Sequence, residues 1–150
     1  MKLEWAFLAE GFGRDSRQAI TVIGINQNVQ IADSLPAITK RGVFAHITDE
    51  EGLLKENDTV SLSLEVRSPE GRVISAQTGE ASVAPAPWPD IPLGIDVVAE
   101  IVMRLHEFGR YSITVRLAHV DADGKTETVD GAISFHVRQP IPTGPPVAIS

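Results

Sequence analysis

The sequence predicts an all-β domain, and three observations support that prediction. About eight short segments alternate apolar and polar residues, which is typical of strands with one buried face. Glycine, proline, aspartate and serine mark the turns between these segments. No segment fits a helical repeat better than it fits alternation. This pattern favours a two-sheet antiparallel β-sandwich, Ig-like or C2-like, with a small closed β-barrel as the alternative.

The clearest strand covers residues 109–117, whose odd-numbered positions are apolar from Tyr111 onward. Tyr111 stands two residues after Gly109, at the start of the strand, which indicates a tyrosine corner. In such a corner the ring packs between the sheets and the hydroxyl group bonds a nearby backbone group. We therefore expect Tyr111 to lie in the core.

The N-terminal part of the chain predicts three strands. Residues 3–9 alternate and place Leu3, Trp5 and Phe7 on one face, which we expect to be the inner face. Residues 19–31 indicate a second strand that pairs back on the first, with a change of parity near Gly24 that suggests a bulge. The third expected strand covers residues 42–48.

The remaining strands follow in the same way. Residues 60–66 and 72–83 predict a hairpin around the turn at residues 68–71. Residues 95–106 fit a strand better than a helix, because every odd-numbered position from 95 to 105 is apolar. After a turn at residues 121–124, the last strand runs to about Arg138.

These strands give one domain over residues 1–138, followed by a proline-rich tail at residues 139–150 that we expect to be extended or disordered. Replacing Trp5 with alanine would cost about 3–5 kcal/mol of stability if its side chain lies in the core. The apolar positions of the strands predict this shared core: Trp5, Phe7, Leu62, Leu64, Tyr111, Ile113, Val115 and Phe135.

The composition argues against several classes of function. The 150 residues include 20 acidic and 13 basic side chains, and the net charge of −7 argues against binding to nucleic acid and to anionic membranes. There is no cysteine, which excludes thiol catalysis, disulfides and thiolate metal sites. The N-terminal segment does not match a signal peptide, and no apolar run has membrane-spanning length. We therefore expect a soluble cytoplasmic protein.

Three short segments resemble one known family. MKLEWAFLAEG at residues 1–11, WP at residues 88–89 and GRY at residues 109–111 are similar to a family of small uncharacterised bacterial proteins that begin MK-x-EWA-x-LAEG. The resemblance covers nearly the whole chain except the tail. It implies an Ig-like or C2-like β-sandwich and carries over no catalytic residue.

The best candidate for a binding residue is Trp88, which lies between Pro87 and Pro89 in a proline-rich segment. A tryptophan on a stiff loop can anchor a protein or a sugar. The alternative, which we favour because large aromatic side chains are mostly buried, is that Trp88 folds back and plugs one end of the sandwich.

Metal and catalytic sites have little support. Asp121 and Asp123 resemble a fragment of a calcium loop, but the closing glutamate of an EF-hand is missing and Asp-Gly is an ordinary hairpin turn. No nucleophile motif such as G-x-S-x-G occurs. We predict no metal, no cofactor and no catalytic residue. The spacing of a zinc motif is missing from the histidines, which are His46, His106, His119 and His136.

The sequence thus favours a non-enzymatic interaction or accessory module with an unknown protein partner. We also expect a homodimer, because the predicted edge strands carry little charge and unprotected edges tend to pair. The alternative is a ligand-binding or enzymatic β-barrel that holds a small apolar molecule between its sheets. A deep cavity would favour that alternative, and a filled core would favour the interaction module; the residues expected to line the cavity are Trp5, Phe7, Tyr111 and Phe135.

Overall fold

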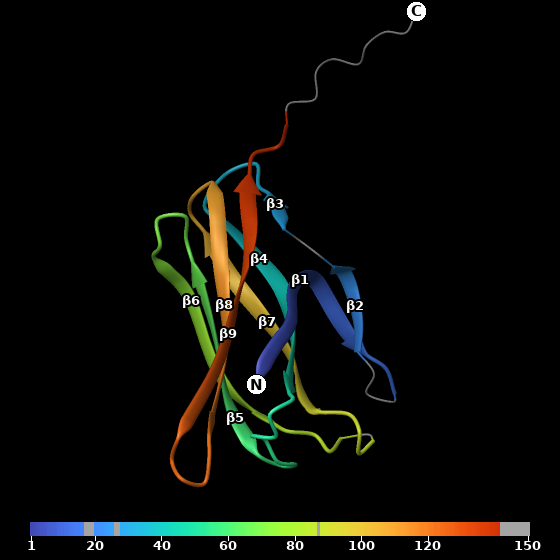
Figure 1. Ribbon diagram of the computed structural model, residues 1–150. Helices are drawn as coiled ribbons and strands as arrows, with labels where there is room; N and C mark the ends of the chain where they lie inside the picture. The colour runs from blue at the N-terminus through green and yellow to red at the C-terminus, as the bar shows by residue number, and fades with distance from the viewer. Residues whose placement is uncertain (17–19, 26–27, 87, 142–150) are drawn as a thin grey trace, which may run out of the picture.

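Two β-sheets lie face to face in the computed structural model, which describes residues 1–16, 20–25, 28–86 and 88–141 (Figure 1). The first sheet has four strands in the order β2-β1-β4-β7, and the second has five in the order β3-β9-β8-β5-β6. The prediction of an all-β, two-sheet domain is confirmed. The described strands are β1 (Lys2–Arg14), β2 (Ile20–Ile25), β3 (Val29–Ile31), β4 (Ala37–Asp49), β5 (Thr59–Arg67), β6 (Val73–Ser82), β7 (Leu93–Leu105), β8 (Gly109–Val120) and β9 (Thr126–Arg138).

The segment expected to be one second strand is divided between the two sheets. β2 pairs with β1 in the four-stranded sheet, whereas β3 pairs with β9 in the five-stranded sheet. The β3–β9 pair is parallel, so the sandwich is not wholly antiparallel, and the described residues hold nine strands where eight were expected. Alternation along the chain cannot reveal such a change of sheet, because both segments are apolar and extended.

The tyrosine corner is confirmed. The Tyr111 side chain is fully buried, and its hydroxyl group donates to the Glu107 carbonyl oxygen at 2.9 Å and accepts from the Glu107 backbone N–H at 3.1 Å. Its ring stacks on Phe135 with the centroids 5.2 Å apart. These contacts fix the start of β8 in the core, as the position of Gly109 and Tyr111 in the sequence predicted.

The inner face of β1 differs from the prediction. A register shift between Leu3 and Trp5 places Leu3 opposite Ile47 and Trp5 opposite His46. A bulge of this kind moves every following side chain to the other face of the sheet. Trp5 and Phe7 therefore point away from the core, and Ala6 and Leu8 point inward.

The rest of the predicted core is largely correct. Leu62 is partly buried at the border of the core, while the other predicted core residues outside β1 are buried. Because Trp5 is 45% exposed, its replacement by alanine should cost less stability than the 3–5 kcal/mol expected from the sequence. The buried members of the predicted core are Leu64, Tyr111, Ile113, Val115 and Phe135.

The last strand ends close to the end of the described part of the chain. β9 ends at Arg138, and residues 139–141 belong to no strand. Residues 142–150 of the proline-rich segment lie outside the described part of the chain. Within the described part, no helix has the length and apolar character needed to cross a membrane.

Candidate functional site

The outer face of the four-stranded sheet carries a cluster of ring side chains, here called the aromatic cluster. Trp5 stacks on Phe7 with centroids 5.3 Å apart and on His46 with centroids 5.5 Å apart. Phe44 stacks on Phe7 at 5.3 Å and meets Phe12 edge-on at 5.6 Å. The five side chains of the aromatic cluster are therefore continuous, and such ring pairs stabilise one another beyond the area that they bury.

The pairing of β1 with β4 builds this cluster. Trp5 lies directly opposite His46, and Phe7 lies directly opposite Phe44. Opposed residues of an antiparallel pair hold their side chains close together on one face, which brings the rings into contact. Phe12 comes from the second half of β1, which pairs with β2 rather than β4 and bends away from the first half (Figure 1).

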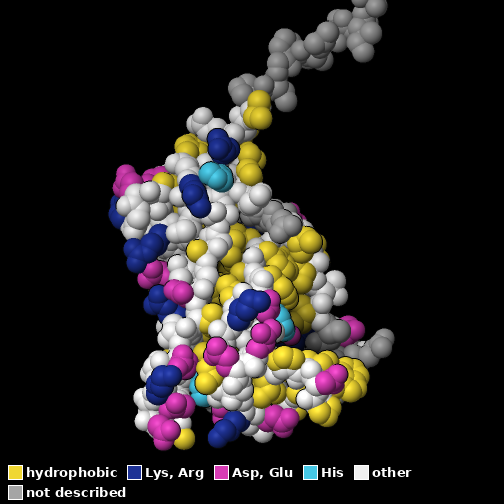
Figure 2. Space-filling view, in the orientation of Figure 1, with side chains coloured by type: hydrophobic (Ala, Val, Ile, Leu, Met, Phe, Trp, Pro, Cys, Tyr) yellow, Lys and Arg dark blue, Asp and Glu magenta, His cyan; other side chains and the backbone are white. Residues whose placement is uncertain are grey.

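The aromatic cluster is only partly covered. Phe44 is buried beneath its neighbours, but Trp5 is 45% exposed. Ile23 and Ile25 on the adjacent β2 are each 58% exposed. Figure 2 shows hydrophobic side chains gathered over β1 and β2. Exposed apolar side chains gathered on one surface are typical of a protein contact site.

Charged groups border the aromatic cluster. The His46 Nδ1 atom lies 2.7 Å from an Asp96 carboxylate oxygen. Glu4 accepts hydrogen bonds from Lys2 at 3.1 Å and from Thr48 at 2.9 Å, and these bonds lower the pKa of the Glu4 carboxyl group below its usual value. Glu4 is therefore ionised at neutral pH. With Asp96 it places negative charge beside the exposed rings.

The opposite face of the sandwich has a different character. The outer face of the five-stranded sheet carries paired charges, including Arg116 with Asp130 at 3.2 Å and Arg67 with Glu65 at 2.7 Å. Its shallow hollow of about 500 Å³ lies over β5, β6 and β8 and is lined mostly by small and polar residues such as Ser61. Figure 2 shows Lys, Arg, Asp and Glu side chains interspersed over these strands. The stacked rings thus lie on the side of the four-stranded sheet, whereas paired charges and small polar residues cover the centre of the five-stranded sheet.

Trp88 does not plug the sandwich, so the arrangement favoured from the sequence is wrong. Its side chain is 63% exposed on the loop between β6 and β7. The Ile91 N–H donates to the Trp88 carbonyl oxygen at 3.1 Å and closes a turn in this loop. Pro89 is also exposed, whereas Pro87 lies outside the described residues. Trp88 therefore stays a candidate anchor.

The candidate metal ligands have structural partners. Asp121 Oδ1 accepts from the backbone N–H groups of Asp123 at 3.0 Å and Lys125 at 2.8 Å, which stabilises the hairpin turn. The buried His119 lies 3.1 Å from an Asp58 carboxylate oxygen. In the parts of the chain that the structure describes, no three His, Asp or Glu side chains are grouped in a way that could hold a metal ion.

Two comparisons with known sequences found no relative of this chain. No protein-family model matches the chain, and no curated protein is similar to it in sequence. The resemblance of residues 1–11, 88–89 and 109–111 to a bacterial family therefore stays a prediction. The surface itself is the basis for an argument about function.

Sequence reasoning missed the aromatic cluster because it placed Trp5 and Phe7 inside. One signal was present: Phe44 and His46 alternate with Val43, Ala45 and Ile47 in β4, so rings at the even positions must face outward if the odd positions are buried. The bulge in β1 had no comparable signal, since nothing in the composition of residues 3–5 requires one.

Proposed function

We propose that this chain is a non-enzymatic interaction module that binds a protein partner through the outer face of its four-stranded sheet. The observation that carries the proposal is the 45% exposure of Trp5 within a cluster of stacked rings. Exposed tryptophan side chains dominate the binding energy of many protein interfaces. The exposed Trp88 on the loop before β7 offers a second anchor.

The charges around the aromatic cluster indicate which side chains a partner surface would present. Glu4 and Asp96 lie beside the rings, and the chain as a whole carries a net charge of −7. A matching partner presents an apolar patch bordered by lysine or arginine. Such charges increase the rate of association at low salt more than they increase affinity.

The positions of four aromatic side chains argue against a ligand held between the sheets. Trp5 and Phe7 lie on the outer face, whereas Tyr111 and Phe135 stack inside the core. These four residues cannot line one cavity. The alternative function, a ligand-binding or enzymatic β-barrel, required such a cavity and is therefore disfavoured.

We also infer an Ig-like arrangement of the two sheets. The inference rests on the segment after β1 that changes sheet and on the tyrosine corner. Sandwiches of that kind serve many functions, so the fold alone does not select this one.

The proposal predicts that Trp5→Ser weakens binding of the partner. The protein would be used to capture its partner from lysate of its native host, and the affinity of the identified complex would be measured by titration calorimetry. We expect a loss of about 2 kcal/mol, roughly 30-fold in Kd, because the indole is replaced by a small polar group at an anchor position. The association rate should also fall as salt concentration rises.

Arg116→Ala provides the matched control, because Arg116 is exposed on the outer face of the other sheet. A partner that binds this variant with wild-type affinity and binds Trp5→Ser weakly supports the proposal. Equal affinity for wild type and Trp5→Ser would contradict it; circular dichroism checks that both variants are folded at the temperature of the titration.

A further inference from the structure

Strand β6 forms an open edge of the five-stranded sheet. It lies last in the sheet order, with β5 as its hydrogen-bonded neighbour among the described strands. Its ten residues contain no proline, and Glu80 is its one charged residue. Gln77, Thr78 and Gly79 at its centre are all exposed. A long, weakly charged edge strand presents unpaired backbone groups to another chain.

The other edges of the sandwich are better protected. β3 is three residues long and β2 is six. The outer face of β7 carries the exposed charges Asp96, Glu100 and Arg104. Short length and charge are the usual ways in which proteins prevent edges from pairing. β6 combines length with little charge, and it lacks both kinds of protection.

We propose that β6 pairs with β6 of a second copy of this chain, in antiparallel orientation, to give a two-fold dimer with one continuous sheet. A two-fold axis perpendicular to the sheet reverses the strand and keeps the inner faces of both copies on the same side. Each residue on the axis therefore lies opposite itself, and Gln77 and Thr78 are the central residues of β6. A pairing of this kind closes on itself and does not continue into a fibre.

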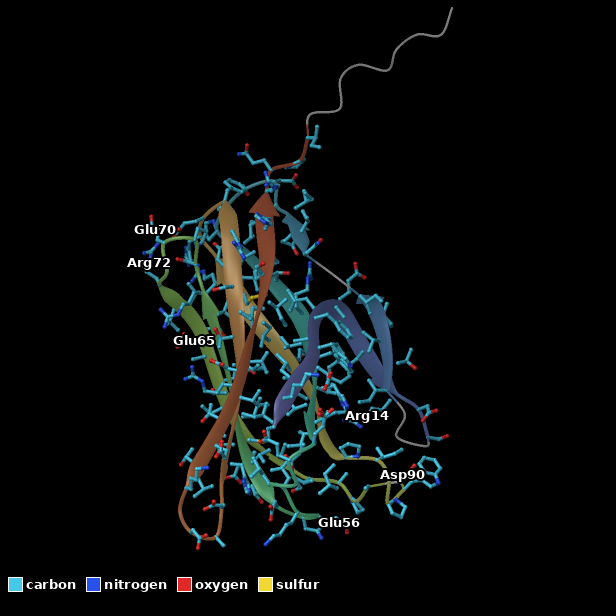
Figure 3. The ribbon with its side chains drawn as sticks, viewed as in Figure 1. Arg14, Glu56, Glu65, Glu70, Arg72 and Asp90 are labelled. Carbon is cyan, nitrogen blue, oxygen red and sulfur yellow. The ribbon has the colours of Figure 1, made fainter. Side chains whose placement is uncertain are left out.

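The charges of β6 favour its own copy as the partner. With Gln77 on the axis, Glu80 lies opposite Ile74; with Thr78 on the axis, it lies opposite Ala76. Like charges directly opposite each other destabilise a pair of strands. Neither register places the Glu80 side chains of the two copies opposite each other. In Figure 3, Glu70 and Arg72 lie at the turn that leads into β6, and their side chains pair at 3.2 Å. Glu70 and Arg72 thus compensate each other at one end of β6, and Glu80 lies near the other end.

This dimer uses a different surface from the aromatic cluster. β6 belongs to the five-stranded sheet, and the rings lie on the outer face of the four-stranded sheet. The two proposals therefore fail independently. Trp5→Ser should leave the dimer intact, and substitutions in β6 should leave binding of the other partner intact.

Because the chain has no cysteine, single-cysteine variants give a direct test. Directly opposed residues of an antiparallel pair have Cα atoms about 4.5–5.5 Å apart, which matches the about 4.4–6.8 Å spanned by disulfides. We expect at least one of Gln77→Cys and Thr78→Cys to form a disulfide-linked dimer under mild oxidation at micromolar concentration. Thr128→Cys is the control, since Thr128 is exposed in the same sheet but lies on β9, three strands away.

Light scattering of the uncrosslinked protein gives the second measurement. We expect a mass that rises with concentration from 16.2 kDa toward twice that value. We expect a Gln77→Lys/Thr78→Lys variant to stay at 16.2 kDa while keeping the wild-type circular dichroism spectrum. A wild-type protein that stays monomeric, or a dimer that persists in the lysine variant, would overturn the proposal. It would also be overturned if both central cysteines crosslink no faster than Thr128→Cys.

Discussion

Replacing Tyr111 with alanine is expected to lower the free energy of unfolding by about 3–5 kcal/mol, the range for a large aromatic side chain removed from a core. The side chain is fully buried and stacks on Phe135. Its hydroxyl group also holds the backbone of Glu107 through two hydrogen bonds, which would be left without their partner. Denaturation with urea, followed by fluorescence or circular dichroism, measures the change.

Tyr111→Phe separates the contribution of the hydroxyl group from that of the ring. This variant keeps the stacking on Phe135 and removes the two hydrogen bonds, so we expect a smaller loss of about 1–3 kcal/mol. The order of stability should be wild type, Tyr111→Phe, Tyr111→Ala. An alanine variant as stable as the phenylalanine variant would show that the ring contributes little, and the account of the core would be wrong.

Replacing Gly109 with alanine should also be costly, although it adds only one methyl group. Gly109 has a φ of 138°, where side chains are strained, and we expect a loss of about 1–3 kcal/mol from the backbone alone. A Cβ atom there would also lie 2.9 Å from the Pro69 ring, which has little freedom to move. The measurement is the shift in the midpoint of thermal or urea unfolding.

Gly13→Ala is the matched control for this prediction. Gly13 lies in β1 without a positive φ, and a Cβ atom added to it would have no contact within 4 Å. We expect its unfolding midpoint to stay close to that of the wild type. If Gly109→Ala were equally mild, the start of β8 would have to adopt a different backbone conformation from the one described here.

The strands β5 and β8 show what local pattern can establish. In both, residues alternate without interruption, and Leu64, Val66, Ile113 and Val115 are buried as the pattern requires. Each strand lies inside the five-stranded sheet with a neighbour on both sides. A period of two is then enough to assign the inner face, because the register with the neighbouring strands is constant from Thr59 to Val66 in β5 and along the whole of β8.

The strand β1 shows where that reasoning stops. Its odd positions over residues 3–9 are apolar, but Ala6 and Leu8 on the other parity are apolar as well. The register shift between Leu3 and Trp5 then reverses the faces. The shift is a property of the pairing with β4 and not of the residues themselves. A single inserted position thus turned an expected core tryptophan into an exposed member of the aromatic cluster.

The sequence by itself determined the all-β class, the positions of most strands, the tyrosine corner and the lack of cysteine chemistry. These features depend on residue identity and on alternation between near neighbours, which are local properties. The tertiary structure alone decided the division of residues 19–31 between two sheets, the outward direction of Trp5 and the open edge at β6. Each of these depends on which strand lies beside which, and residues far apart in the chain settle that choice together through shared burial.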